Sequence, residues 1–188
     1  MIKNAFILNF LKLYNIVWRL AMPLLRKNSR LKQGLEKRIS SDHLGRADIW
    51  IQAASAGEAY LAVKFLKQFT PDSHLNILVT SMTNQGKEIL NEMLSKAEIN
   101  RHIKVIVEWF PFDIPAVMAQ AVDQVSPRVM ILLETEIWPA LFYYLKQKRT
   151  TIAIINARLS KGSFKGYMAA SKILKHISPD LICPTSLR

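Results

Sequence analysis

Residues 132–139 of this chain read Leu132-Leu133-Glu134-Thr135-Glu136-Ile137-Trp138-Pro139. The apolar run 129–133 that leads into this stretch is typical of a buried strand. Pro139 suits the first position of a following helix, where its missing N–H would have no partner anyway. Glu134 and Glu136 therefore fall in a loop at the carboxyl end of a strand, which is where open α/β sheets keep their ligands.

Outward from this loop, short apolar runs alternate with segments of helical periodicity. The runs that we expect to form strands are Ile49–Ala53, Leu75–Thr80, Ile103–Val107, Val129–Leu133 and Thr151–Ile155, with another beginning at Leu181. The segments that we expect to form helices are Glu58–Phe69, Gln85–Leu94, Ile114–Val125, Ala140–Lys148 and Phe164–Ile177. Nearly continuous apolar strands separated by helices indicate βαβ units. The sequence thus predicts an α/β fold, with a Rossmann-like parallel sheet and helices on both faces.

Length and charge divide the chain into two unequal parts. A chain of 188 residues is long enough for one sizeable domain with a real core. The net charge is +12, and residues 1–46 contribute +8 of it through ten Lys/Arg against two acidic residues. We therefore expect a basic arm, residues 1–46, and a globular domain, residues 47–188, with residues 40–45 as the linker. A single cysteine excludes a disulfide framework within the chain.

The first part of the arm has the pattern of an amphipathic helix. Residues 5–25 are mostly apolar, and the polar residues that interrupt them fall on one helical face, namely Asn9, Lys12, Asn15 and Arg19. A helix lying in the membrane interface keeps such a face in water, whereas a spanning helix would bury two cations at about 2.5–3.5 kcal/mol each. The sequence therefore predicts a helix bound to an anionic membrane surface. The alternatives are a helix packed on the chain's own domain and a signal peptide, for which we see no small-residue cleavage site.

The loop after the first predicted strand, residues 55–58, carries another carboxylate. Ser55 followed by Glu58 at the start of a helix has the spacing of a capping box, in which each side chain bonds the other residue's backbone N–H. That interpretation needs no function. The functional alternative is that Glu58 faces a ligand at the carboxyl end of the strand, with Gly57 allowing close approach. Spacing alone leaves both interpretations open.

Two further loops place polar groups at the same predicted edge. Thr80 and Thr83 follow the second strand, where hydroxyls and N–H groups at a helix start can bind an anion, although Thr83 also suits an ordinary N-cap. Arg158 follows the fifth strand, where it can neutralise an acid or bind a phosphate or carboxylate. The two acids of one loop, Glu134 and Glu136, can have pKa values pushed apart, as acid–base chemistry requires. Together the four loops predict a cleft with acids, hydroxyls and an arginine.

Neither a cofactor nor a metal is expected. The sequence contains no Gly-x-Gly-x-x-Gly, so a dinucleotide site of the usual kind is not predicted. No pair of His or Cys residues has metal-ligand spacing. Nucleic-acid binding rests on charge alone, because the basic arm has no aromatic platform after Trp18 and no recognised motif, so we do not expect it.

The loops also resemble a known family, the 3-deoxy-D-manno-octulosonic acid (Kdo) transferases of lipopolysaccharide synthesis. Five segments are similar to the family's motifs and occur in the same order. They read Trp50-Ile51-Gln52-Ala53-Ala54-Ser55-Ala56-Gly57-Glu58, Thr80-Ser81-Met82-Thr83, Phe110-Pro111-Phe112-Asp113-Ile114-Pro115, Glu134-Thr135-Glu136-Ile137-Trp138-Pro139 and Asn156-Ala157-Arg158-Leu159-Ser160.

This resemblance implies the N-terminal half of a GT-B glycosyltransferase. In that family the N-terminal domain binds the acceptor, an N-terminal helix docks on the cytoplasmic face of the inner membrane, and Kdo passes from CMP-Kdo to a lipid A precursor. The resemblance assigns the role of general base to Glu58 and implies no metal. The acceptor-binding residues that we expect are those of the four loops, namely Ser55, Gly57, Thr80, Thr83, Glu134, Glu136 and Arg158.

Two positions and the length depart from the family. Gln52 stands where family members usually carry His, and Ala140 stands where they usually carry Asn. The family is much longer, because a C-terminal domain binds the CMP-sugar, so we expect that a second chain must supply that domain for transfer. The alternative is a non-catalytic membrane-surface binding module, a relic that keeps the fold without turnover.

Overall fold

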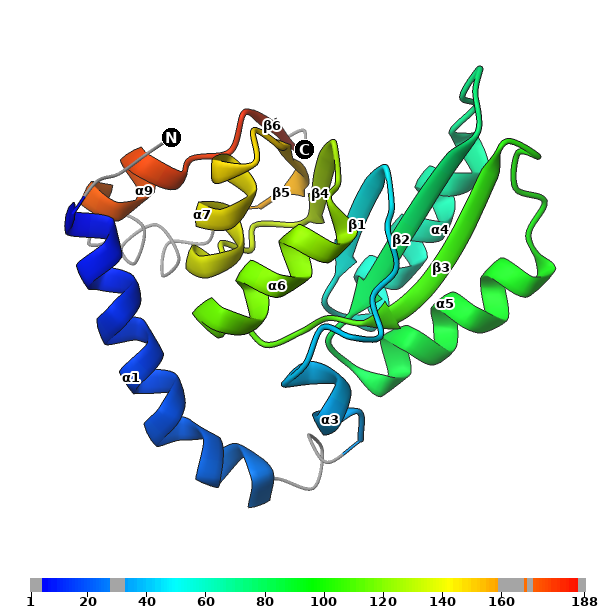
Figure 1. The fold of residues 1–188 in the computed structure, drawn as a ribbon. Coiled ribbons are helices and arrows are strands. Elements are labelled where there is room, and N and C mark those ends of the chain that lie inside the picture. Colours follow the sequence, from blue (N-terminus) through cyan, green and yellow to red (C-terminus); the bar gives the residue numbers. More distant parts are fainter. Residues whose placement is uncertain (1–4, 28–32, 159–167, 169–170, 186–188) are drawn as a thin grey trace.

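The structure is a computed structural model that describes residues 5–27, 33–158, 168 and 171–185. Strands and helices alternate from β1 onward, and Figure 1 shows the strands at the centre with the helices around them. The described elements are α1 (Ala5–Lys27), α3 (Leu35–Arg38), β1 (Ile49–Ala53), α4 (Ala56–Gln68), β2 (Leu75–Ser81), α5 (Asn84–Lys96), β3 (Ile103–Trp109), α6 (Pro115–Val125), β4 (Val129–Leu133), α7 (Pro139–Gln147), β5 (Thr151–Ala157), α9 (Ser171–Ile177) and β6 (Leu181–Pro184).

The strands form one parallel sheet in the order β3-β2-β1-β4-β5-β6. The chain moves outward from β1 to β3 in one direction and outward from β4 to β6 in the other. The boundary between β1 and β4 is therefore a topological switch point. In open α/β sheets, ligands bind in the crevice outside the carboxyl ends of the strands at this point. The predicted fold class, a Rossmann-like α/β sheet, is confirmed.

Apolar side chains pack on both faces of the sheet. β1 is buried along its whole length, and its successive residues point to opposite faces. Trp50 belongs to the cluster that includes α6 and α7, whereas Ile51 belongs to the cluster that includes α4. Full burial of a side chain such as Ile51 contributes about 1.5–3 kcal/mol relative to exposure. This two-sided burial explains why the strands read as continuous apolar runs in the sequence.

Local sequence sets where the helices begin. Ser55 caps α4 and Thr83 caps α5, because their hydroxyl oxygens accept the backbone N–H groups of Glu58 at 3.3 Å and of Gly86 at 3.0 Å. α7 begins at Pro139, where a missing N–H costs nothing. The predictions of an N-cap at Thr83 and of a helix start at Pro139 are confirmed.

Strand ends are where prediction and structure differ. β2 continues to Ser81, β3 to Trp109 and β5 to Ala157, each beyond the last apolar residue of the predicted run. Backbone pairing does not depend on side-chain polarity, so the ladder continues past the point where the apolar pattern stops. Of the predicted helix Phe164–Ile177, the structure describes Ser171–Ile177 as α9, and most of the remainder lies outside the described residues.

Residues 40–45, predicted to be a linker, are part of the packed structure. Leu44 is buried in the same apolar cluster as Trp50, and Ser41 is buried as well. Just before this turn, the buried guanidinium of Arg38 lies 4.5 Å from the ring centroid of Trp109. The composition of Ser, Asp and Gly indicates a connecting turn, but it does not tell whether that turn packs on the sheet, as this one does.

α1 packs on the domain with one face and exposes apolar residues on another. Ile7 and Leu11 are buried, and the Trp18 ring stacks on Phe112 with the centroids 5.4 Å apart. Figure 1 shows this helix along the outside of the molecule. The alternative prediction of packing on the chain's own domain is confirmed for this face. An exposed apolar stripe follows the helix between the packed and the polar faces, formed by Leu13, Val17, Leu20 and Leu24.

The length and mean hydropathy of α1 are sufficient for crossing a membrane, a criterion that signal sequences and buried helices also meet. Only a small part of the helix is buried against the rest of the chain. The apolar stripe therefore suggests membrane association, and the polar face with Lys12 and Arg19 suits a helix that lies in the interface.

Candidate active site

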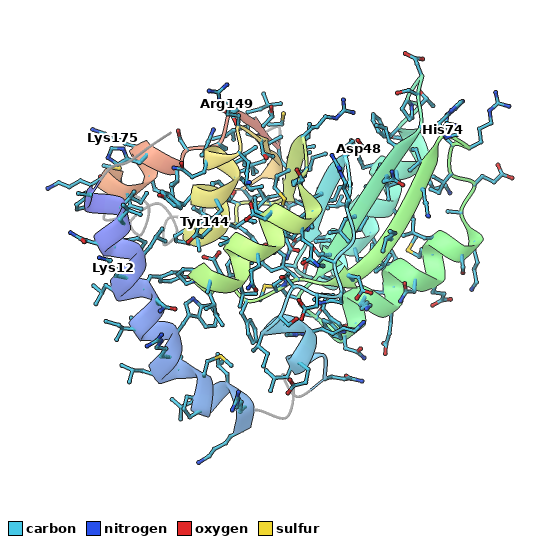
Figure 2. The ribbon with its side chains drawn as sticks, viewed as in Figure 1. Lys12, Asp48, His74, Tyr144, Arg149 and Lys175 are labelled. Carbon is cyan, nitrogen blue, oxygen red and sulfur yellow. The ribbon has the colours of Figure 1, made fainter. Side chains whose placement is uncertain are left out.

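The candidate site lies at the carboxyl edge of the sheet, at the switch point between β1 and β4. Figure 2 labels Asp48, His74 and Arg149 near the starts of β1, β2 and β5, along the upper edge of the sheet, so the carboxyl edge is the opposite one. Within the β1–β4 pair, Gln52 lies opposite Leu132. The loop after β1 and the loop after β4 therefore leave the sheet side by side.

Glu58 is held by hydrogen bonds within its own turn. Its carboxylate accepts the backbone N–H of Ala54 at 2.7 Å and the Ser55 hydroxyl at 2.9 Å, while its own N–H donates to the Ser55 oxygen. Ser55 thus caps the helix as the capping-box interpretation predicts, and the Glu58 carboxylate returns the bond to the Ala54 N–H and the Ser55 hydroxyl in place of the Ser55 N–H, a variant of the capping box. The residue is only 5% exposed. These hydrogen bonds thus fix the carboxylate beside the turn that follows β1, with little contact with solvent.

The pKa of Glu58 reflects this environment. Burial raises the pKa, the hydrogen bonds from Ala54 and Ser55 lower it, and the nearby charge of Glu134 raises it again. The net shift is upward. A carboxyl group with a raised pKa is a stronger base than an ordinary glutamate, and this is the direction that proton abstraction at neutral pH requires.

The loop after β4 turns sharply at Glu134. This residue adopts the left-handed conformation with φ of 65°, and its N–H donates to the carbonyl of Ile155 at 2.9 Å. The N–H of Glu136 then donates back to the Glu134 carbonyl at 3.2 Å. A non-glycine residue in this region costs of order 1–3 kcal/mol, and such strained residues cluster at functional sites.

Glu136 lies in the same electrostatic field as Glu58. Burial raises its pKa first, the charges of Glu58 and Glu134 raise it further, and the indole N–H of Trp138, 3.4 Å from Oε2, lowers it; the result is a pKa of about 7. At neutral pH this side chain is divided between acid and carboxylate, so it can either donate or accept a proton. The structure thus brings three of the predicted acids together. Among the described residues, no group of three His, Cys, Asp or Glu side chains is arranged to hold a metal ion.

Arg158 is joined to the β4 loop through its backbone. The Thr135 hydroxyl donates to the Arg158 carbonyl at 2.6 Å and accepts the Arg158 N–H at 2.9 Å. The side chain of Arg158 is exposed, and it takes part in none of the ion pairs found within the described residues. The predicted neutralisation of an acid by Arg158 is therefore not seen. Leu159 and Ser160, which complete its motif, lie outside the described residues.

Thr80, within β2, and Thr83, at the N-cap of α5, occupy different places. Thr80 is fully buried, donates to Gln52 Oε1 at 2.7 Å and accepts the Trp50 indole N–H at 2.8 Å. The predicted role of Thr80 in binding the acceptor substrate is not supported, because strand alternation turns its hydroxyl into the core. Thr83 is exposed at the start of α5, where its hydroxyl oxygen accepts the N–H of Gly86.

Ser55 and Gly57 are both exposed at the rim of the β1 loop. A side chain at residue 57 would meet only the Ser55 hydroxyl, at 3.9 Å. Packing within the described part of the protein therefore does not require glycine at this position. The functional interpretation, in which glycine leaves room for a ligand beside the backbone of residue 57, stays a prediction.

Asp113, to which the sequence pattern assigned no role, lies directly behind the β4 loop. Its carboxylate is fully buried and accepts the backbone N–H groups of Ala140 at 3.0 Å and of Leu141 at 2.8 Å. Asp113 thus caps α7 from a distant part of the chain, since the side chain of Trp138, the residue at the N-cap position, accepts no hydrogen bond from the first turn of the helix. The sequence separation explains why spacing gave no sign of this role.

The chain is similar to proteins of known type over nearly its whole length. Residues 25–186 match the family model described as 3-Deoxy-D-manno-octulosonic-acid transferase (kdotransferase). A 3-deoxy-D-manno-octulosonic acid transferase of Haemophilus influenzae is 32% identical over 130 residues, which are 69% of this chain and 28% of that protein.

Two further relatives extend this similarity. A bifunctional glycosyltransferase/methyltransferase of Fusobacterium nucleatum subsp. nucleatum is 30% identical over 168 residues, which are 87% of this chain and 26% of that protein. A 3-deoxy-D-manno-octulosonic acid transferase of Bordetella pertussis is 30% identical over 119 residues, which are 63% of this chain and 27% of that protein. The chain spans about a quarter of the length of these relatives.

Proposed function

The chain belongs to the 3-deoxy-D-manno-octulosonic acid transferase family, and we propose that it is the acceptor-binding half of such a glycosyltransferase. It binds a lipid A precursor, and CMP-Kdo is held by a donor-binding domain other than residues 47–188. The observation that carries the proposal is the meeting of Glu58, Glu134 and Glu136 at the switch point of a parallel sheet. A pair of acids with raised pKa values in such a place suits proton transfer from a sugar hydroxyl.

In the proposed reaction, Glu58 acts as the general base. A hydroxyl oxygen of the acceptor attacks the anomeric carbon of Kdo, its proton passes to Glu58, and the bond from Kdo to CMP breaks as the new bond forms. An ionised carboxylate offers about four lone-pair sites. The Glu58 carboxylate accepts from Ala54 and Ser55 within its own turn, so sites remain for the substrate hydroxyl.

The remaining rim residues bind the acceptor. The carboxylates of Glu134 and Glu136 and the hydroxyls of Ser55 and Thr83 suit the hydroxyls of a sugar. Gly57 provides the room beside the backbone, and the exposed guanidinium of Arg158 suits a phosphate of the lipid A precursor. Thr80 is not part of this proposed set, because its hydroxyl is buried in the core.

We place the chain at the cytoplasmic face of the inner membrane through α1. The apolar stripe enters the interfacial layer, and the basic residues at the end of the helix, Arg26 and Lys27, meet anionic headgroups, each contributing about 1 kcal/mol. A membrane-bound position brings the rim close to a lipid-linked acceptor.

Transfer from CMP-Kdo to the lipid A precursor tests the catalytic part of this proposal. The assay contains this chain together with the donor-binding domain of a family member. Glu58→Gln keeps the size of the side chain but removes the base, so transfer should fall by about 10²–10⁴-fold. Glu88→Gln, on the exposed surface of α5, is the matched control and should transfer like the parent. Precursor binding is measured separately, and its absence from the parent chain would refute the proposal.

Vesicle flotation tests the membrane part. Leu20→Asn and Leu24→Asn replace two residues of the apolar stripe that are each 72% exposed, so they should weaken flotation with vesicles rich in phosphatidylglycerol without unfolding the protein. Ile182→Asn replaces an exposed apolar residue on β6 and is the control. Equal flotation of all three variants and the parent would contradict the membrane assignment.

The second candidate is a non-catalytic membrane-surface module with the same fold. The observation that supports it is that the Glu58 carboxylate is already hydrogen-bonded within its own turn and is only 5% exposed, which is the structural role of a helix cap. This candidate predicts that the chain binds vesicles and precursor, but that no donor-binding domain restores transfer. Glu58→Gln then changes only stability. Transfer by the parent that is lost in Glu58→Gln and kept in Glu88→Gln would favour the first candidate, and binding without transfer by the parent would favour the second.

A further inference from the structure

We propose that Asp113 is a positioning residue that ties the loop carrying Glu136 to α1, the helix that carries the apolar stripe. This inference rests on the proposed function in one respect, since it takes Glu136 as part of the acceptor site. The connection runs from α1 to the loop between β3 and α6, residues 110–114, and from that loop to the start of α7.

The first link joins Asp113 to α7. Its two carboxylate oxygens accept the N–H groups of Ala140 and Leu141, the first turn of the helix, at 3.0 and 2.8 Å. These N–H groups have no partner within the helix, so a buried helix start needs an outside acceptor. Because Asp113 is fully buried, the position of its loop determines where α7 begins.

The second link joins the start of α7 to Glu136. Trp138 directly precedes the helix, and its ring packs on Phe110 with the centroids 5.5 Å apart. The indole N–H of Trp138 donates to Glu136 Oε2 at 3.4 Å. Phe110 and Asp113 belong to the same loop, residues 110–114. This loop therefore contacts the segment that follows Glu136 in two ways, through the ring contact with Trp138 and through the cap of α7.

The third link joins the same loop to α1. Phe112 stacks on Trp18 with the centroids 5.4 Å apart and the ring planes 30° from parallel. Tyr14, one turn earlier on α1, is half-buried beside the Asp113 carboxylate, whose charge adds to burial in raising the pKa of the tyrosine. Trp18 and Tyr14 lie on the packed face of α1, and the apolar stripe lies on another face of the same helix. When the stripe docks on a membrane and fixes α1, the contacts of Trp18 and Tyr14 therefore also fix the loop that caps α7.

Two readouts on the full chain test the inference without Kdo transfer. They are amide hydrogen exchange at Ala140 and Leu141 and titration of the Glu136 carboxyl by carbon-13 NMR. Asp113→Asn replaces one acceptor oxygen by an amide group that cannot accept, so exchange at the two amides should become about tenfold faster. The pKa of Glu136 should fall from about 7 toward its ordinary value as the loop opens to water. Asp123→Asn, on the exposed surface of α6, is the matched control.

Vesicles of phosphatidylethanolamine and phosphatidylglycerol test the α1 link. Binding should slow exchange at Ala140 and Leu141 in the parent and not in Trp18→Leu, which keeps the apolar stripe and should still float with the vesicles. A folded Asp113→Asn protein with parental exchange and parental Glu136 titration would overturn the inference. If Asp113→Asn does not fold, Trp18→Leu decides alone, because an unchanged response to vesicles excludes the link. Failure of Kdo transfer would affect only the proposed function.

Discussion

Glu136→Gln should stabilise the fold strongly at alkaline pH and only slightly at acid pH. The pKa of Glu136 is raised from 4.5 to about 7, first by burial and then by the charge of Glu58. Well below pH 4.5 the carboxyl is protonated in the folded and unfolded states alike, so burial costs no charge. Above pH 7 it is ionised in both states, and the folded state bears the full cost of the charge. Stability that the parent has in acid is therefore lost as pH rises through this range.

The magnitude follows from the two pKa values. The full difference between 4.5 and about 7 corresponds to about 3 kcal/mol, at about 1.4 kcal/mol per pKa unit. By linkage, the cost of ionising Glu136 is about 1 kcal/mol at pH 5 and about 3 kcal/mol at pH 8. The glutamine side chain of the variant is never ionised and keeps an oxygen that accepts the Trp138 N–H. The variant should therefore exceed the parent in stability by about these amounts.

Urea unfolding at pH 5 and pH 8, followed by circular dichroism, measures this difference. With a slope of about 2 kcal/mol per molar urea, the midpoint at pH 8 should rise by about 1–2 M. Asp113 is also buried with a pKa of about 7, so the comparison uses the difference between variant and parent at each pH rather than either curve alone. Glu88→Gln controls for the loss of an exposed carboxylate. A difference between Glu136→Gln and the parent that is the same at both pH values would refute the reasoning.

Two pairs of variants, each a test and its control, probe the packing of the N-terminal segments by thermal and urea unfolding. Gly34→Ala should destabilise by more than the about 1–2 kcal/mol that a left-handed non-glycine residue costs, because Gly34 has φ of 72° and a Cβ there would overlap the Trp109 ring; Gly45→Ala has room for its methyl group and should be tolerated. Leu11→Ala should cost about 2–5 kcal/mol, because Leu11 is 5% exposed in the core. Leu13→Ala on the same helix should stay within about 0.5 kcal/mol, because Leu13 is 61% exposed, and equal losses for the two would contradict the packed face of α1.

The central part of the fold was predictable because its signals are local. β1 and β4 are buried on both faces, so they read as unbroken apolar runs, and the structure gives them the predicted bounds Ile49–Ala53 and Val129–Leu133. Pro139 and Thr83 each indicate the start of a helix. Pro139 does so because it lacks a backbone N–H, and Thr83 because its hydroxyl can accept a backbone N–H of the first turn. Each of these features depends on a few neighbouring residues, which a sequence displays directly.

The features that the sequence did not reveal depend on partners far away in the chain. Asp113 caps a helix that begins 26 residues later, and nothing in its own neighbourhood shows that bond. Thr80 follows the last apolar residue of its run, but β2 extends one residue further, so the hydroxyl lies within the ladder and turns into the core. Leu44 lies in a turn whose composition suggests a linker, whereas its burial depends on the cluster beneath it. In each case, tertiary packing decides between two placements that the local pattern allows.

The two interpretations of Ser55 and Glu58 that spacing left open describe one arrangement. A general base has to be held in a fixed position, because a small misplacement of the reacting groups costs much of the rate. The bonds from Ala54 and Ser55 supply that position, and they lower the pKa of Glu58 against the stronger effect of burial. Burial is the main reason that the pKa of Glu58 stays raised despite these bonds, and the nearby charge of Glu134 raises it further. The cap therefore explains where the carboxylate lies, and burial together with the charge of Glu134 explains why its raised pKa suits proton transfer.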